Sequence, residues 1–397
     1  MPLPQECNLQ CLKLKPLAGI YLHIPFCKQA CHYCNFHFST SLKLKNDFLP
    51  ALLKEIRLRE DYLQREDIHT VYLGGGTPSL LEERELESIF EVLHRHFPIH
   101  PDAEVTLEAN PDDLSSVKTS AWKKAGVNRL SIGVQSFFND DLLWMNRAHD
   151  AAQAADSIRL AQAAGISNIS IDLIYGTPTL PDNKWEENLH RAAELGIPHL
   201  SCYALTVEPG TALDFKIRKK RVSDISNEDQ ARQFLLMTDR LQELGYEHYE
   251  ISNLALPGKR SRHNSAYWKG VRYIGLGPSA HSFNGYSRQW NIANNALYIQ
   301  SLAKNNIPFE IEQLTGVQQY NEYVMTSIRT MEGTDIQHVE QQFGKAFYAL
   351  LKNNAAPLIE KKWLVETGRS LILTREGKLF ADRVAAELFA DPSGEEG

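Results

Sequence analysis

Short runs of β-branched and aromatic residues alternate with longer amphipathic stretches between residue 18 and about residue 245. In the first long stretch, Phe48, Leu52 and Ile56 recur at helical spacing. We predict helices near 46–65, 82–96, 112–125, 151–164, 184–195 and 226–244. We predict strands over Gly19–Ile24, Thr70–Leu73, Glu104–Glu108, Arg129–Val134, Ile169–Ile174 and His199–Leu205. This alternation is typical of an α/β fold with a parallel sheet, and six units predict a partial (β/α)6 TIM-like barrel that stays open.

The pattern changes after the sixth unit. Residues 250–305 are rich in Asn, Gly, Tyr and Ser with little periodicity, so we expect irregular connecting structure that reaches back over the barrel. Helical spacing returns from Tyr320 onwards. The predicted strands Trp363–Glu366 and Leu371–Thr374 then flank a turn, and a last helix follows near 376–389. This order resembles a winged helix.

These changes divide the chain into five segments. We predict an N-terminal extension over 1–17, a core barrel over 18–245, a connecting region over 246–308, a C-terminal α+β winged-helix-like domain over 309–390 and a tail over 391–397.

Composition narrows the class of protein. The chain has 397 residues, of which 43% are hydrophobic and 23% charged, which is ordinary globular usage. No uninterrupted apolar stretch approaches the roughly 18 residues of a membrane span, and the first ten residues carry Pro, Glu and Asn where a signal peptide needs apolar residues. We therefore expect a cytoplasmic protein that is not an integral membrane protein.

Charge argues against nucleic acid as a partner. The formal net charge is −7, and residues 309–397 carry nine Lys and Arg against 14 Asp and Glu. A winged helix that binds duplex DNA should be basic. The basic run at 216–221 is most simply a solvated loop or helix face.

Polar motifs follow each predicted strand, where parallel α/β proteins build their sites. The first motif is Cys27-Lys-Gln-Ala-Cys31-His-Tyr-Cys34, which places three thiols within eight residues. A structural zinc ion would need a fourth ligand, such as a neighbouring histidine, whereas a [4Fe–4S] cluster held by three cysteines leaves one iron open for a cofactor. The spacing alone leaves both metals open.

A second motif favours the iron–sulfur cluster over zinc, because the two motifs together resemble a known signature. CxxxCxxC after a first strand, followed by Gly74-Gly75-Gly76-Thr77-Pro78 after the second, resembles the signature of radical S-adenosylmethionine (SAM) proteins. The resemblance implies that the open iron binds SAM and that an electron passed to its sulfonium releases a 5′-deoxyadenosyl radical.

Further motifs resemble the oxygen-independent coproporphyrinogen III oxidase (HemN) group, and most closely its haem-chaperone branch, HemW. These motifs are YLHIPFC, GVQSF, MNRAHD, DLIYGTP and LTREGKLFADRVAAELF. The resemblance implies that Cys27, Cys31 and Cys34 bind the [4Fe–4S] cluster. It implies a SAM site made of Tyr21, Gly75, Gly76, Thr77, Glu108, Gln135, Arg147, Asp172 and Ala204, and Tyr33 adds an aromatic surface for adenine.

Three features favour the chaperone branch over the oxidase. The oxidase motif resembles CxxxCxxCxC, and Phe36 stands at the position of its fourth cysteine. In addition, only 26 residues precede Cys27. The run from His263 to Trp268, HNSAYW, matches the HNxxYW motif associated with haem binding. His263 is thus a candidate axial ligand, with Tyr267 and Trp268 as stacking surface.

The resemblance therefore implies haem delivery to an acceptor apoprotein, such as a subunit of a respiratory complex, with an electron donor as a further partner. The alternative is an enzyme that decarboxylates two propionates of coproporphyrinogen III to vinyl groups. Cys7 and Cys11 repeat the CxxxC spacing without a third cysteine, so we do not expect them to be ligands. Cys202, within a predicted strand, is expected to be a buried apolar residue.

Overall fold

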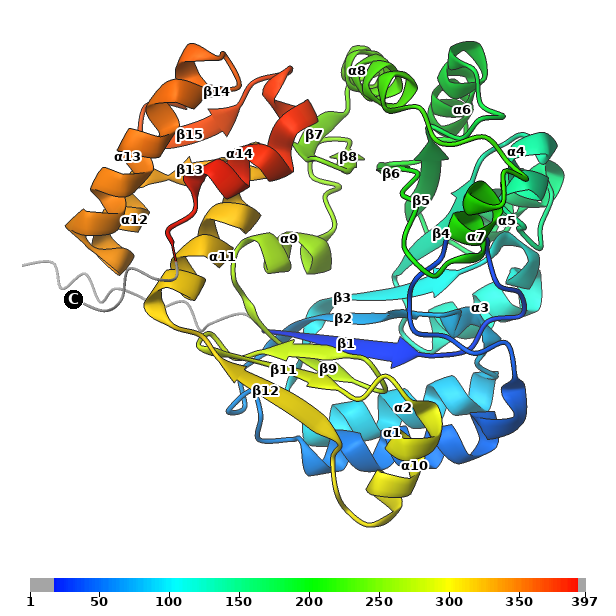
Figure 1. Cartoon of the computed structure of the whole chain (residues 1–397). Helices are drawn as coiled ribbons and strands as arrows, with labels where there is room; N and C mark the ends of the chain where they lie inside the picture. Colours follow the sequence, from blue (N-terminus) through cyan, green and yellow to red (C-terminus); the bar gives the residue numbers. More distant parts are fainter. Residues whose placement is uncertain (1–17, 392–397) are drawn as a thin grey trace, which may run out of the picture.

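Six parallel strands that follow one another along the chain form the centre of the structure, a computed structural model that describes residues 18–391 (Figure 1). They pair in chain order. The strands are β1 (Ala18–Ile24), β2 (Ile68–Gly75), β3 (Ile99–Ala109), β4 (Arg129–Gln135), β5 (Asn168–Tyr175) and β6 (His199–Ala204). All six predicted strands and the partial barrel are confirmed.

Helices cover the outer face of this curved sheet. They are α1 (Lys45–Leu58), α2 (Glu83–His96), α3 (Ser116–Lys124), α5 (Ala151–Ala163), α6 (Asp182–Glu194) and α8 (Asn227–Glu243). Two shorter helices, α4 (Asn139–Trp144) and α7 (Ala212–Arg218), follow β4 and β6 and share a separate small apolar cluster. The sequence patterns predicted all of these except the short helices α4 and α7. Single 3-10 turns stand at Leu42–Leu44, Pro78–Leu80, Pro111–Asp113 and Gly377–Phe380.

Successive residues along each strand point to opposite faces of the sheet, which places apolar and polar side chains on different faces. On β1, Ile20, Leu22 and Ile24 are fully buried against the helices. The intervening Tyr21 and His23 belong to the opposite face, which lines the inside of the barrel. The inner face is therefore free to carry chemistry, while the outer face holds the barrel together.

The sheet continues on both sides of the six strands, so that residues 18–391 contain one sheet of twelve strands. Beyond β6 lie β8 (Asn253–Ala255) and β7 (Glu247–Glu250), and beyond β1 lie β9 (Arg272–Leu276), β10 (His281–Phe283), β11 (Ser287–Asn291) and β12 (Phe309–Gln313). The expectation of irregular structure over 250–305 is wrong. These strands are short and gain order from pairing with β1, β6 and one another, and such pairing leaves little periodicity in sequence.

The HNSAYW motif is also helical rather than irregular. Helix α9 (Arg262–Trp268) lies within the curve of the sheet, near the middle of the view in Figure 1. Its first turn is held by Glu104 of β3, which accepts hydrogen bonds from the backbone N–H groups of Arg262 at 3.2 Å and His263 at 3.0 Å. A carboxylate at a helix N-terminus also opposes the positive end of the helix dipole.

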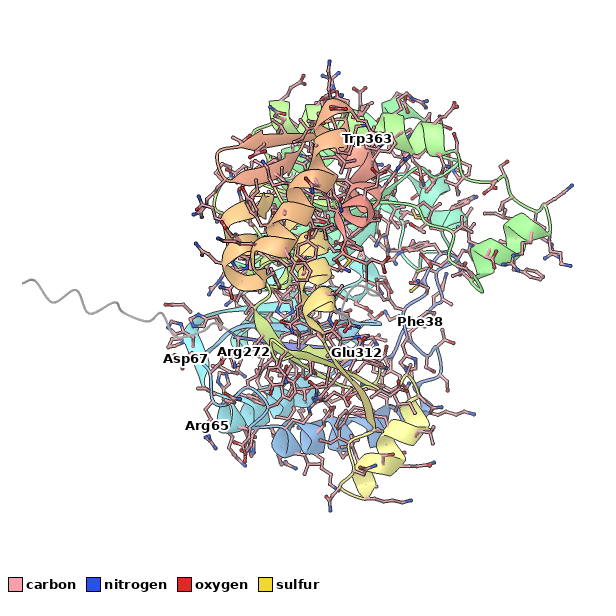
Figure 2. All side chains as sticks on the ribbon, turned by 60° about the vertical axis from the view of Figure 1, so that its left-hand side comes forward. Phe38, Arg65, Asp67, Arg272, Glu312 and Trp363 are labelled. Carbon is pink, nitrogen blue, oxygen red and sulfur yellow. The ribbon has the colours of Figure 1, made fainter. Side chains whose placement is uncertain are left out.

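The C-terminal part has its own apolar core. After α10 (Asn295–Ala303), which packs on α1, it contains α11 (Gly316–Ile328), β13 (Thr334–Asp335), α12 (Ile336–Phe343), α13 (Lys345–Glu360), β14 (Leu364–Thr367), β15 (Ser370–Leu373) and α14 (Ala381–Leu388). The antiparallel pair of β14 and β15 confirms the predicted strand pair. Figure 2 shows Trp363 in this part, above Arg272 and Glu312 of the extended sheet. Within residues 18–391 no helix is long and apolar enough to cross a membrane.

Candidate functional site

A cavity of about 420 Å³ opens at the carboxyl ends of the parallel strands. It collects side chains from positions far apart in sequence, because parallel strands end at the same edge of the sheet. The predicted site residues that line it are Cys27, Cys31, Tyr33, Cys34, Gly75, Gly76, Thr77, Glu108, Gln135, Arg147, Asp172 and Ala204. Tyr21 and His263, which were also predicted, do not line this cavity.

The loop that carries the three cysteines is held against the segment after β4. The backbone N–H of His32 donates a hydrogen bond to the carbonyl of Met145 at 3.1 Å. The side-chain amide of Asn146 donates to the carbonyl of Ala30 at 2.7 Å. These contacts tie the loop to the segment after β4 and hold the three thiols at the cavity wall.

The three thiols are half-buried, free of disulfides and line the cavity. The Thr77 hydroxyl donates to Sγ of Cys27 at 3.4 Å, and Nη1 of Arg147 donates to Sγ of Cys31 at 3.2 Å. Such donors stabilise a thiolate, but burial raises the pKa of Cys27 to about 11 and also raises that of Cys34. Burial thus favours the protonated thiol at these two positions, and a bound metal ion would supply positive charge that favours the thiolate.

The arrangement suits an iron–sulfur cluster better than one zinc ion. Within residues 18–391, no three Cys, His, Asp or Glu side chains lie close enough to hold a single metal ion. The nearby histidines have other partners: Nε2 of His23 bonds the carbonyl of His37 at 2.8 Å, and Nδ1 of His32 bonds the carbonyl of Trp144 at 2.8 Å. Zinc needs four ligands around one centre, whereas a cluster spreads its ligands over several irons.

The glycine motif after β2 brings backbone to the cavity wall. Gly75 has a φ of 106°, a conformation that side chains disfavour. A Cβ on Gly76 would lie 2.7 Å from the carbonyl oxygen of Phe26, so that position admits no side chain either. The glycines therefore let polar backbone groups reach a bound cofactor directly.

Two carboxyl groups, those of Glu108 and Asp172, line the inner wall of the cavity. Glu108 accepts a hydrogen bond from the Tyr72 hydroxyl at 2.8 Å, and Asp172 accepts one from Ser131 at 3.5 Å. Burial raises the pKa of Glu108 to about 7 and that of Asp172 to about 6. Burial makes each carboxylate costly to ionise, so a ligand with hydroxyl or ammonium donors would be favoured there.

Gln135, at the end of β4, also lines this wall. Its φ is 66°, an unusual conformation for a residue other than glycine. Strain of this kind costs of order 1–3 kcal/mol and clusters at functional sites. The conformation aims a group that both donates and accepts hydrogen bonds toward the cavity.

Arg147 ties the cavity wall to the cysteine loop. Its Nη2 donates to Oδ1 of Asn110 at 2.7 Å and to the carbonyl of Gly133 at 2.9 Å, while Nη1 donates to Cys31. Within residues 18–391 its Nε has no hydrogen-bond partner. The predicted pairing of Arg147 with the SAM carboxylate stays a prediction, and its contacts here add a role in positioning the cysteine loop.

His263 lies inside the barrel and is only 2% exposed. Its Nδ1 lies 2.8 Å from Oγ1 of Thr70, its Nε2 lies 2.9 Å from the hydroxyl of Tyr267, and its ring stacks on Tyr72 at 4.9 Å between centroids. Burial lowers the pKa of His263 to about 3, so the ring is neutral. A bond from this histidine to haem iron would require α9 to move, and its ligand role stays a prediction.

Several polar residues that line the cavity were not predicted, among them Asn110 and Ser131. The Asn110 side chain accepts a hydrogen bond from Arg147 and donates one to Oγ1 of Thr77 at 3.2 Å. These two bonds link the segments that follow β2, β3 and β4. Asn110 belongs to the motif EANPDD after β3, of which only Glu108 had been assigned. Ser131 lies on β4 in the same period-two series as Gln135, and that spacing was the available signal.

Residues 21–211 match the Radical SAM superfamily and residues 314–380 match the HemN C-terminal domain. The chain is 35% identical to the heme chaperone HemW of Mycobacterium tuberculosis, covering 93% of this chain and 94% of that one. It is 32% identical to that of Bacillus subtilis, over 93% and 98% of the two chains. The Escherichia coli chaperone is 37% identical over 68% of this chain and 71% of its own.

A solved structure supports the same architecture. Coproporphyrinogen III oxidase (HemN) from Escherichia coli, described as a radical SAM enzyme, superimposes with a TM-score of 0.83 at 23% identity. The superposition covers 95% of this chain and 91% of the other. At this identity the likeness concerns the fold.

Proposed function

The chain belongs to the HemW family of radical SAM proteins, and on that premise we propose that it is a haem chaperone, which binds haem and transfers it to an acceptor protein. The observation that carries the proposal is the likeness to heme chaperones over more than nine-tenths of the chain. The family implies a [4Fe–4S] cluster and SAM, and the cavity at the strand ends offers groups suited to both.

Cys27, Cys31 and Cys34 would hold the cluster. Thiolates are the ligands that iron–sulfur clusters take, and three of them leave one iron open. When bound, the cluster supplies an electron and a binding position for SAM. Thr77 and Arg147 donate hydrogen bonds to two of the sulfurs, and such bonds tune the potential of a cluster.

SAM would lie between the cysteine loop and the strand ends. Gly75, Gly76 and Thr77 offer backbone to its methionine part, and Tyr33 offers a flat surface to adenine. The hydroxyls of ribose and the SAM ammonium are donors that match Glu108, Asp172 and Gln135, while Ala204 completes the wall opposite. The Arg147 guanidinium lines the cavity, and its positive charge would suit the SAM carboxylate.

The cysteine loop supports a chaperone over an oxidase. Phe36, at the position of the oxidase's fourth cysteine, is 69% exposed at the mouth of the cavity. An exposed aromatic ring offers apolar contact but no metal ligand. The acceptor and the electron donor would be further protein partners, and a respiratory-complex subunit is the acceptor we favour.

The proposal is tested on anaerobically reconstituted protein. We expect about four iron and four sulfide ions per chain and stoichiometric haem binding, measured from the Soret band. We also expect the bound haem to pass to apomyoglobin, which a shift of the Soret band would report. The same sample is given coproporphyrinogen III with SAM and a reductant. Repeated turnover to a divinyl product, or failure to bind haem, would contradict the chaperone function.

A further inference from the structure

A second cavity, of about 990 Å³, lies between the extended sheet and the C-terminal helices. Its walls come from β1, the end of α9, strands β9 to β11, and helices α11 and α12. It adjoins the first cavity, because Asn35 and Phe36 of the cysteine loop line both. Its volume is at the upper end of what small-molecule sites show, so it has room for a ligand larger than SAM.

Aromatic rings form much of this cavity. Tyr267 meets Tyr273 edge to face at 4.7 Å between centroids, and Tyr273 lies 6.3 Å from Phe283. On the opposite wall, Tyr323 and Phe343 lie 5.9 Å apart. Two facing aromatic walls bind flat apolar ligands well, because ring stacking adds to the burial of apolar surface.

The cavity also offers a free metal ligand. His281 lies on β10 on the same face as Phe283, it is exposed, and its ring makes no hydrogen bond within residues 18–391. It stacks on Trp290 of β11 at 6.1 Å between centroids, which limits the orientations of its ring. By contrast, His37 bonds Oδ1 of Asn295 at 2.7 Å through Nε2. A neutral imidazole with both nitrogens free is the common axial ligand of haem.

Positive charge stands at the rim of the cavity. Lys269, the residue after α9, is exposed and forms no ion pair within residues 18–391. Arg288 of β11 lines the same cavity and is paired with Glu322 of α11 at 2.7 Å. A flat apolar ligand with anionic groups along one edge would match this distribution, and the propionates of haem are such groups.

We propose that haem binds in this second cavity, with His281 as an axial ligand and Lys269 beside a propionate. This rests on the proposed chaperone function. His263 is then a positioning residue: its bond to the Tyr267 hydroxyl fixes the orientation of a cavity wall, and it does not touch the macrocycle. Since Asn35 and Phe36 are shared by both cavities, the cysteine loop borders the bound haem.

Haem titration of the full-length, cluster-loaded protein tests the assignment. We expect His281→Ala to weaken haem binding at least tenfold and to abolish the spectrum of imidazole-bound iron, with iron and sulfide content unchanged. His94→Ala, on the outer surface of α2, is the matched control and should bind as the wild type does. Lys269→Gln should weaken binding severalfold and reduce its dependence on salt.

Two further variants separate the positioning role of His263 from a ligand role. His263→Gln keeps a group able to bond Tyr267 and should retain the imidazole-bound spectrum, whereas His263→Ala should weaken affinity without changing the iron coordination. Loss of that coordination in both His263 variants, with His281→Ala unaffected, would overturn the proposal. His338 of α12 also lines this cavity, so loss of the coordination in His338→Ala alone would overturn the proposal as well. A wild-type protein that binds no haem would instead contradict the chaperone function itself.

Discussion

Replacing Glu108 by Gln is expected to stabilise the SAM-free protein and to weaken SAM binding. The carboxyl group lies in the first cavity, and burial raises its pKa to about 7 from 4.5. A raised pKa means that ionisation costs stability in the folded state only. This cost is absent below pH 4.5, grows between pH 4.5 and 7, and is complete above pH 7.

The size of the effect follows from the same shift. A difference of about 2.5 pKa units corresponds to about 3 kcal/mol at 1.36 kcal/mol per unit. This is an upper bound, because the side chain is partly exposed to the cavity. We expect Glu108→Gln to raise the free energy of unfolding by up to about 3 kcal/mol at pH 8, and by less than about 1 kcal/mol at pH 5.

Urea unfolding of the SAM-free protein at pH 5 and pH 8 measures this difference, and equilibrium dialysis at pH 8 measures SAM binding. SAM should bind at least tenfold more weakly to the variant, because an amide is a weaker acceptor than a carboxylate. Glu104→Gln is the matched control: this carboxylate lies on the same face of β3 but holds the first turn of α9. Its replacement should cost about 1–3 kcal/mol at both pH values. Equal stabilisation of Glu108→Gln at both pH values, or a loss at pH 8, would refute the reasoning.

Three other predictions are simpler. Cys31→Ser should lose the iron–sulfur absorbance of reconstituted protein while Cys202→Ser, a buried strand residue, keeps it; four irons per chain in Cys31→Ser would contradict the ligand role. A lysine at position 147 cannot bond Asn110, Gly133 and Cys31 together, so we expect Arg147→Lys to bind SAM at least tenfold more weakly and to lose iron faster to a chelator. Unchanged SAM affinity and unchanged iron loss would argue against the positioning role of Arg147. Trp185→Ala should cost about 3–5 kcal/mol in urea unfolding, since the ring is fully buried, and a cost below about 1 kcal/mol would show that the core closes over the gap.

Much of the first cavity could be predicted because its determinants are local. The three cysteines fall within eight residues, and most of the remaining groups lie in or just after the last residues of a strand whose apolar run is visible in sequence. Parallel strands bring their carboxyl ends to one edge wherever the fold forms. The residues named from the strand ends therefore meet in the structure, although different strands contribute them from distant parts of the sequence.

The roles of individual groups were harder to predict. Arg147 was expected to face SAM, yet two of its nitrogens are already bonded to the cavity wall and the cysteine loop. His263 was expected in an irregular segment, yet it lies on a helix with both ring nitrogens engaged. Partners of this kind come from distant segments, such as Thr70 on β2, and leave no spacing in the chain.

The sequence by itself therefore determined the six βα units, the cysteine motif and the edge of the sheet where the functional site is expected. These features follow from hydrophobic periodicity and strand order, which the residue pattern shows directly. The tertiary structure alone decided that residues 250–305 extend the sheet and fill the barrel with α9. It also decided that a second cavity forms between this extension and the C-terminal helices. Short edge strands and shared cavities depend on pairing between remote segments, and that pairing is set by packing rather than by local pattern.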